Sequence, residues 1–162
     1  MPNVIGDLPL TAAWAYKYDS ERKGINIHAD QAVVNINFWI TPDDANLDPT
    51  SGGLVVYHRE PPEEWSFAEY NNFESEPKIE KYVSEGPWGE KKTVVPYRQN
   101  RAVIFNSKLF HKTDEHRFKK GLLNRRINLT FLFGIGTNER VPTEEQKAAE
   151  ERKVWDRREG EL

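Results

Sequence analysis

The chain has 162 residues, of which 37% are hydrophobic and 12% aromatic, so it is long enough to bury one core and too apolar to be disordered. Its formal net charge of -3 gives no general attraction to nucleic acid or to anionic membranes. The absence of cysteine excludes disulfides, thiolate catalysis and thiolate-held zinc, so any bound metal must be held by histidine and carboxylate side chains.

Short apolar runs recur along the first part of the chain and are rich in Val, Ile, Phe, Tyr and Trp. Gly, Pro, Asp and Asn separate these runs, a pattern typical of strands rather than of long helices. The predicted strands are 10–18, 25–28, 33–40, 54–57, 93–97, 102–105 and 127–133. We therefore predict a single, mainly β domain over 1–162, whose core strands span about 10–134 and form a barrel or a sandwich.

Two segments depart from the strand pattern. The insertion at about 60–92 opens with Pro61-Pro62 and carries acidic and aromatic residues at spacings that allow a short helix. We interpret it as a cover over a site. Later, Thr143-Glu-Glu-Gln is a capping box followed by a narrow apolar stripe, which predicts a C-terminal helix over about 143–158.

Polar and apolar residues alternate in two of the predicted strands. Asn35 and Asn37 share one face of their strand, and Arg126 shares a face with Asn128 and Thr130 on the last strand. A guanidinium, an amide and a hydroxyl aligned on the last strand indicate the wall of a polar pocket. The alternative is an outer, solvated face, because polar strand residues more often face water.

His28-Ala-Asp30 is the segment with the clearest chemical meaning. A His and an Asp two residues apart on an extended segment point to the same side, so both can bind one cation. A second imidazole, for which His111 is the candidate, completes a two-His, one-carboxylate set of the kind that holds Fe(II) in non-haem oxygenases. Of the other histidines, His116 lies in a polar stretch, whereas His58 could line the mouth of a pocket.

Taken in order, these motifs resemble the 2-oxoglutarate and Fe(II)-dependent oxygenase superfamily over about 18–133. The resemblance rests on His28-Ala-Asp30, Ser51-Gly-Gly-Leu54, residues 100–105 leading to His111, and Arg126-Ile-Asn-Leu-Thr130. It implies a double-stranded β-helix, a cupin-like jelly roll, with a helical insertion and a C-terminal helix. It also implies Fe(II) as cofactor, with 2-oxoglutarate and dioxygen as cosubstrates.

The resemblance assigns roles to the residues that match its motifs. His28, Asp30 and His111 would ligate iron. Arg126 would bind the distal carboxylate of 2-oxoglutarate, since a guanidinium binds carboxylates bidentately and stays charged. Arg125 competes for this role, but it shares its strand face with apolar residues, and we therefore favour Arg126.

Three further residues are predicted to contact the cosubstrate. Tyr18 lies where prolyl hydroxylase-like relatives carry a tyrosine that hydrogen-bonds 2-oxoglutarate, with core packing as an equal explanation. Asn128 is predicted from its place on the strand face of Arg126, and Asn37 from its place on the polar face of its own strand. Trp39, on the same face as Asn37, is better explained as a core residue.

The implied activity is hydroxylation, or oxidative demethylation, of a small-molecule or peptidyl substrate. A membrane span needs about 20 consecutive apolar residues, and no stretch of the sequence approaches this length. The first residues also lack the features of a signal peptide, so we expect a cytoplasmic protein. Neither nucleic acid nor membrane is an expected partner, and a homodimer is compatible with the sequence. The alternative is a cupin-type metal-binding protein or isomerase without 2-oxoglutarate chemistry. An Arg126 side chain that reaches into the barrel would argue against this alternative.

Overall fold

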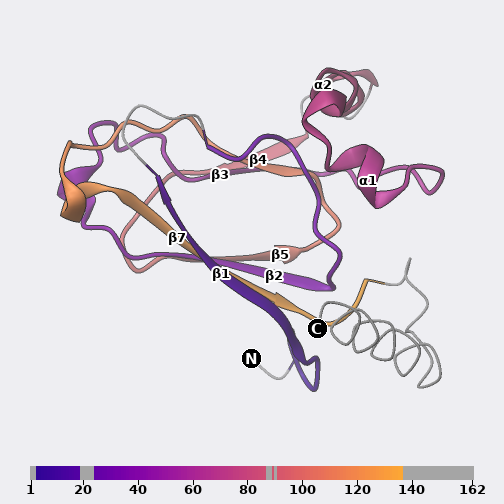
Figure 1. Cartoon of the computed structure of the whole chain (residues 1–162), viewed down its shortest axis with the longest axis horizontal. Helices are drawn as coiled ribbons and strands as arrows, with labels where there is room; N and C mark the ends of the chain where they lie inside the picture. Colours follow the sequence, from indigo (N-terminus) through magenta and orange to yellow (C-terminus); the bar gives the residue numbers. More distant parts are fainter. Residues whose placement is uncertain (1–2, 19–23, 87–88, 90, 137–162) are drawn as a thin grey trace, which may run out of the picture.

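The structure is a computed structural model that describes residues 3–18, 24–86, 89 and 91–136. Two antiparallel sheets lie one above the other, with two short helices at one end (Figure 1). The four-stranded sheet has the order β1 (Leu10–Tyr18), β7 (Arg126–Phe133), β2 (Val34–Trp39) and β5 (Ala102–Asn106). The three-stranded sheet has the order β4 (Lys92–Val95), β3 (Leu54–Tyr57) and β6 (His111–Thr113). The prediction of a mainly β fold is confirmed as a β-sandwich, whereas the double-stranded β-helix stays a prediction.

Most predicted strands are present within one or two residues of their expected bounds, and β1 and β3 have the bounds expected. The predicted strand at 25–28 is wrong, because this segment is irregular and forms only one bridge, between His28 and His111. Strand β6, which begins at His111, was not predicted, since three residues are too few to show a periodic pattern.

The insertion contains α1 (Phe67–Tyr70), the 3-10 turn Phe73–Ser75 and α2 (Glu76–Ser84). Ser66 and Glu69 form a capping box at the start of α1. Further 3-10 turns lie at Asp43–Ala45 and Leu122–Asn124. The helices of the described residues are too short and too polar to cross a membrane. The predicted helix over about 143–158 lies outside the described residues.

Two apolar clusters hold the sandwich together. One joins α2 to the sheets and contains Ile27, Ala29, Val55, Tyr57, Tyr70, Ile79, Val83 and Phe110. The other contains Trp39, Ala45, Leu54, Val56, Tyr97 and Phe118. Strand β3 contributes alternate residues to both clusters, so it is buried on both faces, as expected for the central strand of its sheet.

The four-stranded sheet turns its polar side chains inward. Each of them is at most 5% exposed: Asn35 and Asn37 on β2, and Arg126, Asn128 and Thr130 on β7. The apolar residues that alternate with them, such as Ile36 and Leu129, are only half-buried. The alternative interpretation, in which these polar residues form an outer, solvated face, is therefore wrong. Because burying polar groups costs stability, this inward polar face is better explained by function than by folding.

Candidate metal centre

His28 and Asp30 lie on the irregular segment before β2, and His111 is the first residue of β6. His28 and His111 face each other across a backbone bridge, with N–H to carbonyl distances of 3.0 and 2.8 Å. Their rings lie 4.2 Å apart between centroids. A third backbone bond, from Asp30 N–H to the Ser107 carbonyl at 3.1 Å, fixes the other end of the segment. The backbone thus brings His111 beside His28 and Asp30, although it lies far from them in sequence.

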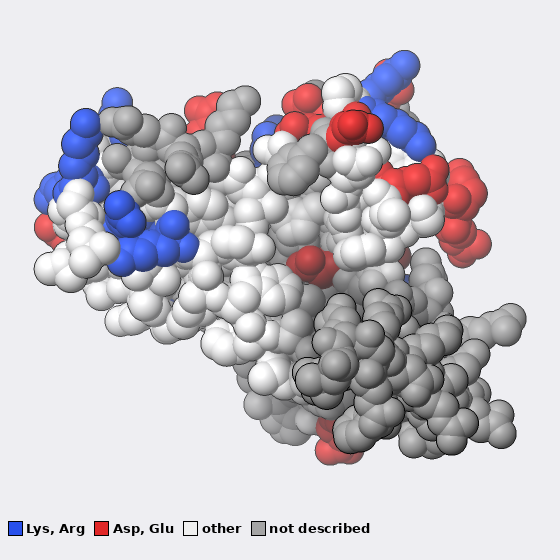
Figure 2. Space-filling model, viewed as in Figure 1, with Lys and Arg blue, Asp and Glu red and all other residues white. Residues whose placement is uncertain are grey.

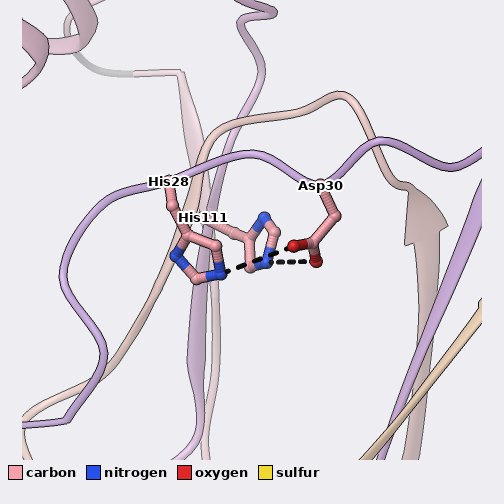
Figure 3. A group of neighbouring side chains, drawn as sticks. All are labelled: His28, Asp30 and His111. Atoms are coloured by element: carbon pink, nitrogen blue, oxygen red, sulfur yellow. Dashed lines mark ion pairs between the residues drawn. The ribbon is translucent and has the colours of Figure 1, made fainter. Parts of the chain in front are cut away.

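The three side chains converge on one point (Figure 3). Nε2 of His111 lies 3.4 Å from one Asp30 carboxylate oxygen, and Nε2 of His28 lies 4.0 Å from the other. One donor atom from each residue falls within 4.8 Å of the others. The cluster therefore has the size and the donor types needed to hold one metal ion.

The second nitrogen of each imidazole bonds to the backbone. Nδ1 of His28 lies 2.8 Å from the carbonyl oxygen of Asn26, and Nδ1 of His111 lies 2.9 Å from that of Leu109. A carbonyl can only accept a hydrogen bond, so Nδ1 carries the proton in both neutral rings. Each Nε2 lone pair is then free for a metal, which is the arrangement found around histidine ligands.

Electrostatics favours the protonation states that metal ligands require. Burial, reinforced by the neighbouring His111, lowers the pKa of His28 to about 4. Burial alone would raise the pKa of Asp30, but its interactions with His111 and His28 and the amide of Asn35 outweigh burial and lower it. The Asn35 amide donates to the carboxylate at 2.7 Å. At neutral pH the centre therefore presents a neutral His28 and an ionised Asp30.

The lowered pKa of His28 makes the stability of the metal-free protein depend on pH. Above pH 6.5 His28 is neutral in both the folded and the unfolded chain, so its contribution to stability is complete. As the pH falls from 6.5 toward about 4, the unfolded chain takes up a proton that the folded chain rejects, and the free energy of unfolding falls. The slope due to this group is at most about 1.4 kcal/mol per pH unit.

Urea unfolding at a series of pH values would measure this dependence, with His28→Gln as the variant that lacks the titrating group. We expect the variant to show a flatter profile between pH 6.5 and about 4. Equal slopes in the two proteins would mean that His28 is not held neutral by the fold. Asp30 titrates below this window, because its pKa lies below the ordinary value of 3.8.

A cavity of about 420 Å³ adjoins the cluster. It is lined by all three cluster residues and by residues of the inward polar face, namely Asn37, Arg126, Asn128 and Thr130. The insertion lines it as well, with Phe67, Asn71, Asn72 and Glu76. The cavity thus joins the candidate metal centre to a cationic side chain and to the insertion.

Arg126 is 1% exposed and is anchored by two backbone carbonyls. Its Nε donates to the Gly52 oxygen at 2.6 Å and its Nη2 to the Gly53 oxygen at 2.9 Å, whereas its buried Nη1 has no hydrogen-bond partner among the described residues. Gly53 must be glycine here, since a Cβ would lie 1.8 Å from the Val95 oxygen. Burial lowers the pKa of Arg126 to about 10, so the side chain remains a cation at neutral pH.

A buried cation with an unused donor has the chemistry that an anion-binding site requires. No carboxylate among the described residues forms an ion pair with Arg126. Neutral carbonyls hold its position without cancelling its charge. A ligand carboxylate in the cavity would supply both the missing hydrogen-bond partner and the missing negative charge.

Of the other three residues predicted to contact the cosubstrate, two line the cavity and one does not. Asn128 and Asn37 line the cavity, and the carboxamide oxygen of Asn128 is buried without a partner among the described residues. The Tyr18 ring lies 5.1 Å from the Arg126 guanidinium carbon, and its hydroxyl lies 3.4 Å from that of Thr113, so it is beside Arg126 without lining the cavity. Its role in cosubstrate binding stays a prediction.

The structure also locates Arg125, the alternative to Arg126, and His58, which was predicted as a possible residue at the pocket mouth. Arg125 precedes β7 and does not line the cavity, and its carbonyl accepts a hydrogen bond from Thr41. His58 is exposed, bonds to the Thr93 hydroxyl at 2.7 Å and does not line the cavity either.

The sequence interpretation missed Asn35, Asn71 and Glu76. Asn35 donates to Asp30, and its place on the strand face of Asn37 was the signal that could have identified it. Asn71 and Glu76 reach the site only through the packing of the insertion, which no local pattern shows.

No family model matches the sequence, and no curated protein matches it. The crystal structure of EvdMO1 is similar, with a TM-score of 0.56 and 14% identity over 82% of this chain and 29% of that chain. HygX from Streptomyces hygroscopicus, solved with iron bound and as apo protein, gives TM-scores of 0.47 and 0.46 at 11% identity. These comparisons cover 83% of this chain and 61% of HygX. The likeness to EvdMO1 shows a shared fold and no more, and the likeness to HygX is too weak to carry an argument.

Proposed function

We propose that the chain is a non-haem Fe(II), 2-oxoglutarate-dependent dioxygenase that hydroxylates, or oxidatively demethylates, a small-molecule or peptidyl substrate. The observation that carries this proposal is the presence, in one cavity, of a His28, Asp30 and His111 cluster and a buried Arg126 with an unused donor. Either feature alone is compatible with other functions. Together they match a metal ion and an anionic cosubstrate bound side by side.

The donor set fits iron. Two imidazoles and one carboxylate on one side of a metal leave about three of six octahedral positions for other ligands, which is the arrangement that non-haem Fe(II) oxygenases use. Both histidines present Nε2 because their Nδ1 atoms are fixed by backbone carbonyls. The Asn35 amide orients the carboxylate of Asp30. The protein would therefore supply a preorganised set of three donors at the wall of the cavity.

Arg126 fits the distal carboxylate of 2-oxoglutarate. Its guanidinium is held rigidly by the carbonyls of Gly52 and Gly53, so little side-chain entropy is lost when an anion binds to Nη1. Burial of the Arg126 side chain strengthens this pairing. When bound, iron and 2-oxoglutarate would supply oxidising power by activating dioxygen, one atom of which enters succinate as carbon dioxide is lost while the other oxidises the substrate. The residues of the chain bind, orient and shield these groups.

The insertion provides the expected substrate side of the cavity. Acidic side chains gather over α1 and α2 (Figure 2), and Glu76, the first residue of α2, lines the cavity itself. This charge disfavours anionic substrates, including nucleic acids. We therefore propose a neutral or cationic substrate, with the insertion determining specificity.

Succinate formation tests the proposed activity without knowledge of the substrate. Metal-free protein would be loaded anaerobically with Fe(II) and 2-oxoglutarate and then exposed to air, with the Zn(II)-loaded protein as control. We expect slow succinate release that requires both iron and 2-oxoglutarate. Iron-loaded protein that releases no succinate would favour the alternative, a cupin-type metal-binding protein or isomerase.

A further inference from the structure

Asn71, the C-cap residue that follows α1, hydrogen-bonds to the backbone between two of the proposed metal ligands. Its side-chain oxygen accepts the N–H of Ala29 at 3.2 Å, and its amide donates to the carbonyl of Ala29 at 2.9 Å. Ala29 is 1% exposed and lies between His28 and Asp30. One side chain of the insertion thus pairs both backbone polar groups of the central residue in the ligand segment.

A second hydrogen bond joins the insertion to the other side of His28. The amide of Asn26 donates to the Glu76 carboxylate at 2.7 Å, and the carbonyl of the same Asn26 lies 2.8 Å from Nδ1 of His28. The bond that fixes the tautomer of His28 therefore involves a residue that is itself held by α2. Both contacts join segments that are far apart in sequence.

These contacts replace strand pairing that the ligand segment lacks. Only His28 forms a backbone bridge there, and Ala29 is buried with no ladder partner. Without Asn71, the N–H and carbonyl of Ala29 would lose their partners in a buried place. The two peptide planes flanking Ala29, which lead to His28 and Asp30, could then rotate.

We propose that Asn71 is a positioning residue for the metal centre and that it couples the insertion to metal binding. This inference rests on the proposed metal site. Metal binding fixes His28 and Asp30, which fixes Ala29 and, through it, the end of α1. By linkage, a ligand that orders the insertion raises the affinity for the metal by the factor by which the metal raises the affinity for that ligand.

Titration with Co(II) under nitrogen tests this role without turnover. Asn71→Ala is compared with Asn124→Ala, a matched control whose amide donates to the Lys120 carbonyl at 2.8 Å and which does not line the cavity. We expect Asn71→Ala to bind Co(II) about 10- to 100-fold more weakly, with a changed visible spectrum at saturation. Asn124→Ala should keep the affinity and spectrum of the wild type.

Hydrogen exchange of the wild-type protein, with and without Zn(II), provides a test that needs no variant. Metal should slow exchange at Ala29 and in residues 66–84 of the insertion. A wild type that binds Co(II), with unchanged affinity and spectrum in Asn71→Ala, would overturn the role of Asn71 and leave the metal site standing. A wild type that binds no Co(II) would overturn the metal site itself, and the inference with it.

Discussion

Replacement of Arg126 by alanine is expected to weaken 2-oxoglutarate binding to the metal-loaded protein by about 150- to 4,000-fold. Breaking a buried, hydrogen-bonded charge pair by removing one partner costs about 3–5 kcal/mol, and each 1.4 kcal/mol is tenfold in affinity. Arg126 is 1% exposed and has no carboxylate partner among the described residues. Among the described residues that line the cavity, Arg126 is the only Lys or Arg, so no other described cation there could take its place.

Calorimetric titration under nitrogen would measure this loss, with two further variants beside Arg126→Ala. Arg125→Ala should bind within about twofold of the wild type, because Arg125 does not line the cavity. Arg126→Lys keeps the charge but lacks the planar fork, so it should give an intermediate affinity. Normal binding by Arg126→Ala, or lost binding by Arg125→Ala, would contradict the assignment.

Loss of His111 is expected to have a comparable effect on the metal. His111→Ala should bind Fe(II) at least about 100-fold more weakly, since one of three protein ligands is removed and each typically contributes several kcal/mol to metal affinity. The side chain is 4% exposed, so neighbouring residues cannot easily turn into its place. Its backbone bonds to His28 do not require the imidazole and should keep the ligand segment in position.

His58→Ala is the matched control for this experiment. His58 is exposed, bonds to Thr93 and does not line the cavity, so its loss should leave metal affinity unchanged. Equilibrium dialysis under nitrogen measures the affinities, and circular dichroism checks that both variants fold. Equal iron binding by His111→Ala and the wild type would remove His111 from the metal centre.

The strands could be predicted where apolar alternation and turn residues bound them clearly. Strand β3 is an example, since Gly52-Gly53 precede a short apolar run in the sequence. The strand expected at 25–28 failed because the N–H of Ile25 bonds to the Thr113 side chain instead of to a strand carbonyl, which leaves a single bridge at His28. Local propensity cannot show such a replacement.

The orientation of the polar faces could be predicted only in part. Strand parity grouped Asn128 and Thr130 with Arg126, but it could not say whether this group faces the cavity or water. In the structure these residues are buried around a cavity, and hydrogen bonds among them offset part of the desolvation, as between Asn128 and Thr130 at 2.9 Å.

The candidate metal centre was the most predictable part of the site. His28 and Asp30 are close in sequence, and their spacing alone places both donors near one point. Placing His111 beside them required the ordered set of motifs. Asn71 and Glu76, in contrast, reach this segment through the tertiary packing of the insertion, and nothing in their own sequence surroundings distinguishes them.

Visible absorption under nitrogen, on sequential addition of Fe(II) and 2-oxoglutarate, tests most directly whether one cavity holds both. We expect a broad charge-transfer band that appears only when both are present and that is lost in Arg126→Ala and in His111→Ala. Saturating iron and 2-oxoglutarate without such a band in the wild type would contradict the proposal that the two bind together.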